Sequence, residues 1–423
     1  MNYKNYFIKA FVLTIVIFST TAKIAATSCA PPADHYRPIY MPLEEFRNAV
    51  KSLQPIDLSN PTKILEHENF LFIVEEDKGI HVIDNNDPRN PTNLSFINVP
   101  GVHDITSKGN TLYADSAIDL VALNIIDPTM VVETARLQDI YSSELILASE
   151  RWEKPVDPSK GIVIGKTFVG KSKCKSSFSE PTNNNIFSCS ESSSASSVTL
   201  DNATNTGVNG STSKMVVVDD YLYLLNQENI KTIHIADPNS PVVINTELLG
   251  WDIETIFYQE SNLYIGGQTG VRILDISNPT FPTYVSTYQH TWQCDPIVVK
   301  GTIGYVTLRR GSRCRGDESA LQIIDLTDIT NPQFIESYPL DDPYGLSIDN
   351  NFLFVTNTNN GFMIFDVSDY LDIQLISSFN IGPTYDVITR NSMAIIVGKN
   401  GVYQYNYQDI NNVTQLSLIP VKE

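Results

Sequence analysis

Aromatic and acidic residues recur in five short loops, each directly before a predicted strand. Trp and Tyr beside carboxylates suit a sugar, an amine or a peptide, because the rings offer apolar and cation-binding faces while the carboxylates accept hydrogen bonds. The loops are GVHDI (101–105), GWDIE (250–254), HTWQCDP (290–296), DDPYG (341–345) and PTYDV (383–387). The candidate ligand-binding residues are His103, Asp104, Trp251, Asp252, Trp292, Asp295, Tyr344, Tyr385 and Asp386.

The same loops could instead supply acid–base chemistry. His103, Asp104 and Asp295 are of the types that transfer protons in hydrolases and lyases, and such groups can be assembled from separate repeats. Local catalytic signatures are absent, since the six His form no HExxH or other i,i+4 pair and no GxSxG elbow, phosphate-binding loop or calcium loop occurs. The sequence therefore predicts no catalytic residue, no metal site and no cofactor.

The elements that position these loops follow from a repeat of about 40 residues. Its first motif is a hydrophobic strand that ends in a polar residue and a turn, as in GVRILDISNP (270–279) and GFMIFDVSDY (361–370). The spacing is 40 or 41 residues except for two longer gaps, of 110 and 50 residues, which hold insertions. The aligned polar residues are Asp84, Asn124, His234, Asp275, Asp325, Asp366 and Asn406.

A second motif has the same period. It is a short β-branched or aromatic run after a turn signal, such as FLF (70–72) and FLF (352–354). With one strand before it and one after the first motif, each unit has four antiparallel strands, which is one propeller blade. The repeats predict an all-β, seven-bladed β-propeller of four-stranded antiparallel blades, in which blades packed face to face bury their apolar surfaces.

In such a propeller the candidate loops ring one mouth of the central channel. The alternative interpretation is that they only cap the channel and bond to neighbouring blades, because channel mouths need hydrogen-bonded polar groups in any case. The recurring Asp and Asn of the first motif are interpreted as turn residues rather than ligands, because these side chains bond to their own backbone and the following Pro sets φ.

The motif resembles the LVIVD repeat, a propeller unit of bacterial and archaeal envelope proteins. It consists of an aliphatic strand, Asp, an aliphatic residue, Ser or Ala, Asp or Asn, and Pro. The stretches at 36–50, 78–91 and 291–309 are similar to a group of uncharacterised LVIVD lipoproteins of Gram-negative envelopes. The resemblance covers nearly the whole mature chain and implies a fold and a location. It implies no activity.

The N-terminus resembles an export signal. Lys4 and Lys9 precede an apolar run (10–18) that is too short to span a bilayer, and small residues follow it up to Cys29. The site resembles a lipobox, which predicts lipid attachment at Cys29, although Lys23 departs from the usual pattern. The alternative is a plain signal peptide with an incidental cysteine. We expect an exported cell-envelope protein, an outer-membrane lipoprotein that faces the periplasm or the cell surface.

The cysteine count agrees with a lipid anchor, since an exported chain pairs its thiols and five is an odd number. Two local disulfides would leave Cys29 over, and zinc binding is the alternative. The four expected disulfide residues are Cys174, Cys189, Cys294 and Cys314.

The expected organisation is a signal peptide (1–28), a lipid-anchored tether with a short helix (29–60) and a propeller (61–423). Within the tether, apolar spacing places the helix at 43–53. A Ser/Asn-rich insertion at about 153–213 fills the gap of 110 residues and lacks the apolar residues for a core of its own.

Composition limits the partners. The net charge of −19 would repel the phosphates of nucleic acid and anionic lipid headgroups, so no nucleic-acid partner is expected. The most economical function is a non-enzymatic binding or scaffold module, a monomeric propeller that docks an envelope protein, a glycan or a peptide. The alternatives are a hydrolase or lyase with its active site at the channel mouth, and a spacer without a specific ligand.

Overall fold

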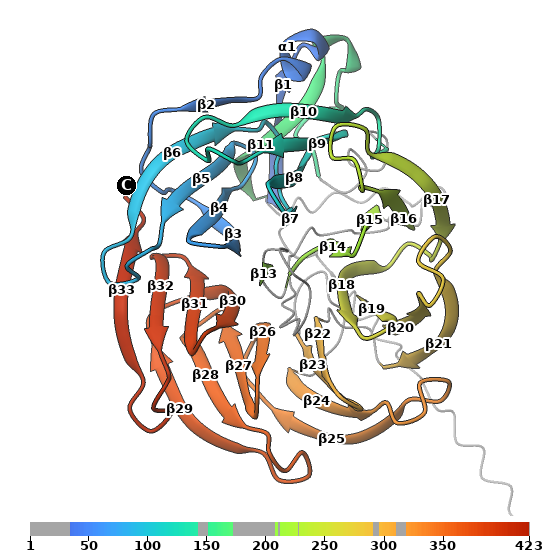
Figure 1. Cartoon of the computed structure of the whole chain (residues 1–423), viewed down its shortest axis with the longest axis vertical. Helices are drawn as coiled ribbons and strands as arrows, with labels where there is room; N and C mark the ends of the chain where they lie inside the picture. Colours follow the sequence, from blue (N-terminus) through green and yellow to red (C-terminus); the bar gives the residue numbers. More distant parts are fainter. Residues whose placement is uncertain are drawn as a thin grey trace, which may run out of the picture.

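The computed structural model shows a propeller of seven four-stranded antiparallel blades around a central axis (Figure 1). This confirms the predicted architecture. The residues described are 34–142, 151–171, 208–209, 212–226, 228–290, 296–309 and 319–422.

Each blade is one consecutive run of four strands, numbered here from the innermost strand outward. Blades 1 and 2 contain β3 (Pro61–His67), β4 (Phe70–Glu75), β5 (Gly79–Asp84), β6 (Thr92–Asn98), β7 (Ile105–Lys108), β8 (Thr111–Ser116), β9 (Asp119–Asn124) and β10 (Val132–Leu137). Blades 3 and 4 contain β14 (Met215–Val218), β15 (Tyr221–Asn226), β16 (Asn229–His234), β17 (Val242–Leu248), β18 (Ile253–Gln259), β19 (Asn262–Gly267), β20 (Gly270–Asp275) and β21 (Thr283–Gln289). Blades 5 to 7 contain β22 (Ile297–Lys300), β23 (Ile303–Leu308), β24 (Ala320–Asp325), β25 (Gln333–Pro339), β26 (Pro343–Asp349), β27 (Phe352–Asn357), β28 (Gly361–Asp366), β29 (Gln374–Asn380), β30 (Thr384–Arg390), β31 (Met393–Gly398), β32 (Gly401–Asn406) and β33 (Thr414–Pro420).

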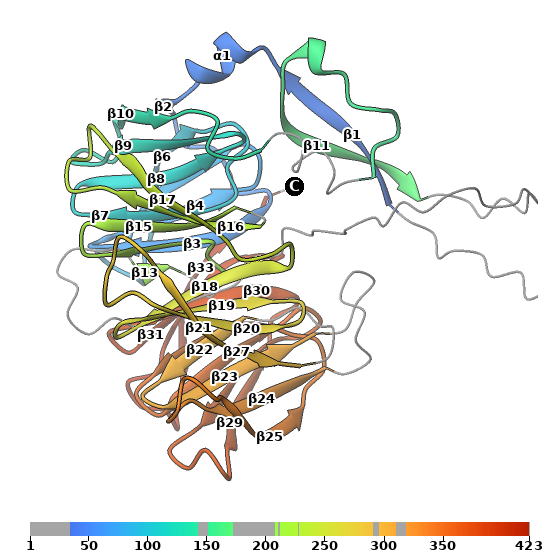
Figure 2. The same ribbon diagram turned by 90° about the vertical axis from the view of Figure 1, so that its right-hand side faces the viewer.

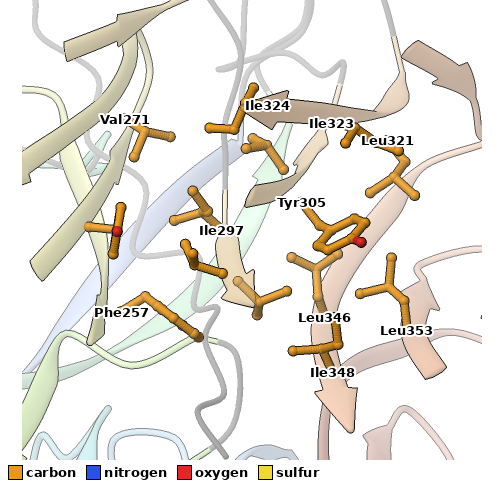
Figure 3. Close-up of a cluster of buried hydrophobic side chains, with 14 of the residues drawn as sticks. Phe257, Val271, Ile297, Tyr305, Leu321, Ile323, Ile324, Leu346, Ile348 and Leu353 are labelled. Carbon is orange, nitrogen blue, oxygen red and sulfur yellow. The ribbon is translucent and has the colours of Figure 1, made fainter. Parts of the chain in front are cut away.

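The hydrophobic core lies between neighbouring blades. Inner strands such as β4 and β27 are almost entirely buried, because both of their faces pack on other blades, whereas outer strands such as β17 alternate towards solvent. Figure 3 shows one cluster, in which Phe257 of blade 4, Tyr305 of blade 5 and Leu346 of blade 6 meet. Burial of this kind stabilises a fold by about 25 cal/mol per Å² of apolar surface.

The recurring Asp and Asn residues are turn residues, as predicted. Asp275 Oδ1 accepts a hydrogen bond from the backbone N–H of Ser277, and Asp325 accepts the equivalent bond from Thr327. These bonds lower the pKa of both carboxyls. Asn124, Asp366 and Asn406 make the same contact two residues along the chain, so the repeated polar residue organises the turn into the outer strand.

The ring closes where blade 7 meets blade 1, and no strand of the described blades is exchanged between the chain ends. Asn85 and Gln404 exchange side-chain hydrogen bonds of 3.0 and 2.7 Å across this seam. Leu58 forms a parallel bridge with Val421, and both pack in an apolar cluster between the two blades. Side-chain packing and hydrogen bonds therefore close the ring.

The N-terminal segment differs from the predicted helix at 43–53. Helix α1 covers only Leu43–Arg47, and residues 51–53 form strand β2 (Lys51–Leu53), which pairs with the outer strand β6. An outer strand leaves a row of unpaired backbone groups, and this segment satisfies them. Phe46 is fully buried and Arg47 pairs with Asp119, so α1 is attached to blade 2.

A two-stranded ribbon stands outside the propeller (Figure 2). It pairs β1 (Asp34–Met41) with β11 (Ile162–Lys171), which follows the 3-10 helix η1 (Pro158–Lys160). Residues 34–41 belong to the predicted tether and 162–171 to the predicted insertion, and the two segments form a sheet together. No helix in the described part of the chain is long and apolar enough to cross a membrane.

Candidate functional site at the channel mouth

Four of the predicted residues meet in one pocket at the mouth of the channel. His103 and Asp104 precede β7, Tyr344 lies in β26 and Tyr385 in β30. The pocket encloses about 200 Å³. Its lining residues are Asn60, Thr62, Lys63, Glu76, His103, Asp104, Lys214, Tyr344 and Tyr385.

The other predicted residues lie elsewhere. Asp252 is 3% exposed and accepts hydrogen bonds from Arg272 and Thr269 of its own blade, so it is a structural carboxylate that organises blade 4. Trp251 is 45% exposed and does not line this pocket. Trp292, Asp295 and the five cysteines (Cys29, Cys174, Cys189, Cys294 and Cys314) lie outside the described residues.

The segment that returns from the insertion reaches the pocket at Lys214. Strand β13 (Val208–Asn209) adds to the inner edge of blade 1 by pairing with β3, and so lies in the central channel (Figure 1). Ser213 Oγ and Lys214 N donate to Asp104 Oδ2 at 2.8 and 2.5 Å. Thr212 Oγ1 donates to Asp386 Oδ2 at 3.0 Å. These two carboxylates therefore hold the segment 212–214 across the channel.

Lys63 completes this buried network. Its Nζ donates to the carbonyl oxygen of Thr212 and lies 3.8 Å from Asp104 Oδ1, and both side chains of this pair are 5% exposed. Burial lowers the pKa of Lys63, and the charge of Asp104 opposes that shift. Burial likewise raises the pKa of Asp104, against the effect of Lys63. Lys63 depends on the charges of Asp104 and Asp386 to remain charged away from water, and Asp104 depends on Lys63.

His103 is held between two carboxylates at the rim. Its Nε2 lies 3.1 Å from Asp77 Oδ1 and its Nδ1 lies 3.7 Å from Asp115 Oδ2. Burial lowers the pKa of His103, but the interactions of its ring with the Asp115 and Asp77 carboxylates outweigh this and raise the pKa to about 10. At neutral pH His103 is thus an imidazolium cation with both ring nitrogens protonated. It cannot act as a general base there.

The remaining wall of the pocket is aromatic. The rings of Tyr344 and Tyr385 meet edge to face with centroids 6.4 Å apart. The guanidinium carbon of Arg309 lies 4.1 Å from the centroid of the Tyr344 ring, within the range of a cation–π interaction. Burial raises the pKa of Tyr385, so its hydroxyl is neutral and can donate a hydrogen bond.

Sequence reasoning missed Lys63, Lys214 and Glu76. Lys63 occupies in blade 1 the strand position of Asp386 in blade 7, since each directly follows a β-bulge in the first strand of its blade. The repeat register was therefore the available signal. Lys214 and Glu76 had no such signal, because one ends an insertion and the other lies in a turn between strands.

The pocket continues into a larger cleft of about 630 Å³ beneath the ribbon, and both share Asn60 and Glu76. Strands β1 and β11 contribute Tyr36, Ile39, Met41, Ile164, Lys166 and Phe168, and blade 1 contributes Lys78, Phe96, Asn98 and others. Lys166 N donates to Asp77 Oδ2 at 3.3 Å. Because Asp77 also contacts His103, the ribbon is attached to the rim of the mouth. Among the described residues, no group of three or more His, Cys, Asp or Glu could hold a metal ion.

Comparison with known families finds the LVIVD repeat twice, at residues 259–290 and 344–380. The second match corresponds closely to blade 6. The matches confirm the resemblance to LVIVD-repeat propellers. No curated protein matches the sequence.

Solved structures show similarity of fold alone. A functionally unknown protein from Desulfotomaculum acetoxidans aligns with a TM-score of 0.50 at 10% identity, covering 84% of this chain and 97% of that chain. PorZ, a surface component of the type-IX secretion system of Porphyromonas gingivalis, has a TM-score of 0.48 at 11% identity. That alignment covers 88% of this chain but only 40% of PorZ. The computationally designed protein Ika8 has a TM-score of 0.48 at 8% identity over 86% of this chain and 89% of its own.

Proposed function

Because the chain carries LVIVD repeats on a seven-bladed propeller, we propose that it is a non-enzymatic binding or scaffold module of the cell envelope. Its partner, an envelope protein, a glycan or a peptide, would dock at the channel mouth and the adjoining cleft. The proposal includes export, lipid attachment at Cys29, residence at the outer membrane and a monomeric propeller. Disulfides between Cys174 and Cys189 and between Cys294 and Cys314 belong to the same proposal.

The observation that carries the proposal is that Asp104, Asp386 and His103, the acid–base candidates of the mouth within the described residues, already have structural partners. Asp104 accepts hydrogen bonds from the segment 212–214 and faces Lys63. Asp386 bonds to the same segment. His103 is held protonated between Asp77 and Asp115. A hydrolase would need one of these groups free to move a proton at neutral pH. This arrangement disfavours the hydrolase or lyase alternative.

The rest of the pocket lining is of another kind. Tyr344 and Tyr385 contribute aromatic rings, and Lys214, Glu76 and Asn60 contribute polar groups beside them. Aromatic rings next to mixed polar groups suit ring hydroxyls of a sugar or the backbone of a peptide. The apolar cleft that continues from the pocket provides room for a larger partner.

The test is chemical crosslinking of the native membrane-associated protein, followed by affinity capture and mass spectrometry. Wild type is compared with the double variant Tyr344→Ala/Tyr385→Ala. The matched control is Tyr284→Ala, at a side chain that is 59% exposed on the outer strand of blade 4. We expect a stoichiometric envelope partner with wild type and control, and at least a ten-fold loss with the double variant, as for aromatic side chains at the centre of an interface.

Equal capture by all three proteins would contradict the mouth as the docking site. Turnover of a glycan or peptide by the wild type would contradict the non-enzymatic proposal. The intact mass of the purified protein reports separately whether Cys29 carries lipid.

A further inference from the structure

We propose that the ribbon unit, defined as residues 34–41 and 151–171, rests on the surface of an anionic lipid bilayer. Its nearness to a membrane rests on the proposed lipid at Cys29. Its affinity for lipid rests on the composition and geometry of the unit itself.

The charge of the ribbon unit is opposite to that of the chain. Residues 34–41 and 151–171 contain six Lys and Arg against three Asp and Glu, a net charge of +3 within a chain of −19. The basic side chains are accessible, since those of Arg37 and Lys160 are 62% and 60% exposed, and Lys154 is also exposed. Basic residues near an anionic bilayer are attracted to it. The acidic remainder is screened where it lies more than a Debye length, about 8 Å, from the surface.

Aromatic and apolar side chains of the ribbon unit fit the region between headgroups and acyl chains. Phe168 is 54% exposed, Ile39 44% and Val169 39%; Phe168 and Ile39 also border the cleft beneath the ribbon, whereas Val169 does not. Lys166 lies over the ring of Tyr36 and Lys160 over the ring of Tyr40. Tyr and Trp concentrate at membrane interfaces because their rings are apolar at one end and polar at the other. The ribbon unit therefore carries basic side chains and aromatic or apolar side chains on one protruding element.

The position of the ribbon unit agrees with such a contact. It projects from one side of the propeller (Figure 2), and β1 begins at Asp34, five residues after Cys29. At about 3.5 Å per residue these positions lie at most about 18 Å apart. A lipid on Cys29 would therefore bring the ribbon unit to the headgroups. The channel mouth adjoins the cleft under the ribbon, so it would open towards the bilayer.

The test measures partition of the processed chain carrying Cys29→Ser, which has no lipid of its own. The probes are vesicles of phosphatidylcholine alone and vesicles that also contain phosphatidylglycerol. We expect binding to the anionic vesicles that weakens with added salt, and an emission shift of Trp152, identified by its loss in Trp152→Phe. Each basic residue near the surface contributes a factor of about five, so Lys154→Gln/Lys160→Gln should weaken partition about 25-fold.

A matched control is Arg89→Gln/Lys300→Gln, which removes the same charge from the β5–β6 and β22–β23 turns. We expect it to bind like the parent, because these turns lie at the strand ends away from the mouth. Equal weakening by both double variants, or no binding to anionic vesicles, would overturn the proposal. Loss of a crosslinked protein partner in the ribbon variant, with vesicle binding unchanged, would assign the ribbon unit to a protein instead. The assay requires neither acylation nor a partner, so its failure is distinct from failure of the proposed function.

Discussion

Replacing Asp104 by Ala should destabilise the propeller from the centre of its channel. The substitution removes the acceptor of three hydrogen bonds, from Ser213 Oγ, Lys214 N and Ile105 N. It also leaves Lys63 with a 5% exposed side chain and without the carboxylate 3.8 Å away. The perturbation therefore removes one of the two carboxylates that hold the segment 212–214 and takes the nearer of two carboxylates from a buried cation, leaving Asp386.

The magnitude follows from the buried pair. Removing one partner of a buried ion pair costs about 3–5 kcal/mol, because the remaining charge stays desolvated. The hydrogen bonds to Ser213 and Lys214 belong to the same network and do not add independently. We expect Asp104→Ala to lower the free energy of unfolding by about 4 kcal/mol. A second substitution, Lys63→Met, should restore part of it, since an apolar side chain of similar length leaves no stranded charge.

The assay is urea unfolding followed by circular dichroism, for wild type, both single variants and the double variant. We expect a coupling free energy of at least about 2 kcal/mol between the two sites. Glu153→Ala is the control, because this carboxylate forms an exposed ion pair with Arg37 and should cost less than about 1 kcal/mol. A loss below about 1.5 kcal/mol for Asp104→Ala, or strictly additive effects with Lys63→Met, would refute the account of the channel network.

Three further predictions concern other charges and the seam. Burial raises the pKa of Glu75, but hydrogen bonds from His81, Ser59 and Lys78 outweigh this effect and lower the pKa to about 2. The charged Glu75 therefore stabilises the fold by up to about 3 kcal/mol above pH 4.5, and this stabilisation is lost as pH falls towards 2. In Glu75→Gln the free energy of unfolding should depend less on pH between 4.5 and 2. The pKa of His103 is raised to about 10, so its ring resonances should not titrate between pH 6 and 9. The stabilisation from the charged ring should be present below pH 6.5, be lost as pH rises through 10, and be absent in His103→Gln, which pH-dependent unfolding measures. Gln404→Ala should cost about 2 kcal/mol in thermal or urea unfolding, because it strands the buried Asn85 amide at the seam, and a cost under 0.5 kcal/mol would contradict that role.

The fold was predictable because its signals are local. Hydrophobic runs that end in Asp or Asn and a turn recur every 40 residues, and each supplies strand pattern and turn chemistry within about ten positions. The hydrogen bond from Ser277 N to Asp275 is such a contact, made two residues along the chain. The mouth was predictable in part for the same reason. His103, Tyr344 and Tyr385 precede or begin the first strands of their blades, and ring symmetry brings these positions together.

The tertiary structure decided what lies far apart in sequence. Residues 51–53 have helical apolar spacing, but the open edge of β6 recruits them as a strand. The sequence predicted Asp252 as a ligand-binding residue of the mouth, but its carboxylate accepts a hydrogen bond from Arg272 of its own blade. Residues 34–41 pair with 162–171, and Thr212 reaches Asp386 across the channel.

The sequence by itself thus determined an all-β propeller of LVIVD-type repeats and some of the residues that meet at its mouth. The tertiary structure alone decided that the returning segment 212–214 lies in the channel, that Asp104 and Asp386 hold it, and that a basic ribbon covers the cleft beside the pocket. The physical reason is that strand pattern and turn chemistry are encoded within a few neighbouring residues. Partners separated by a hundred residues or more are chosen by burial and hydrogen-bond satisfaction in the folded chain.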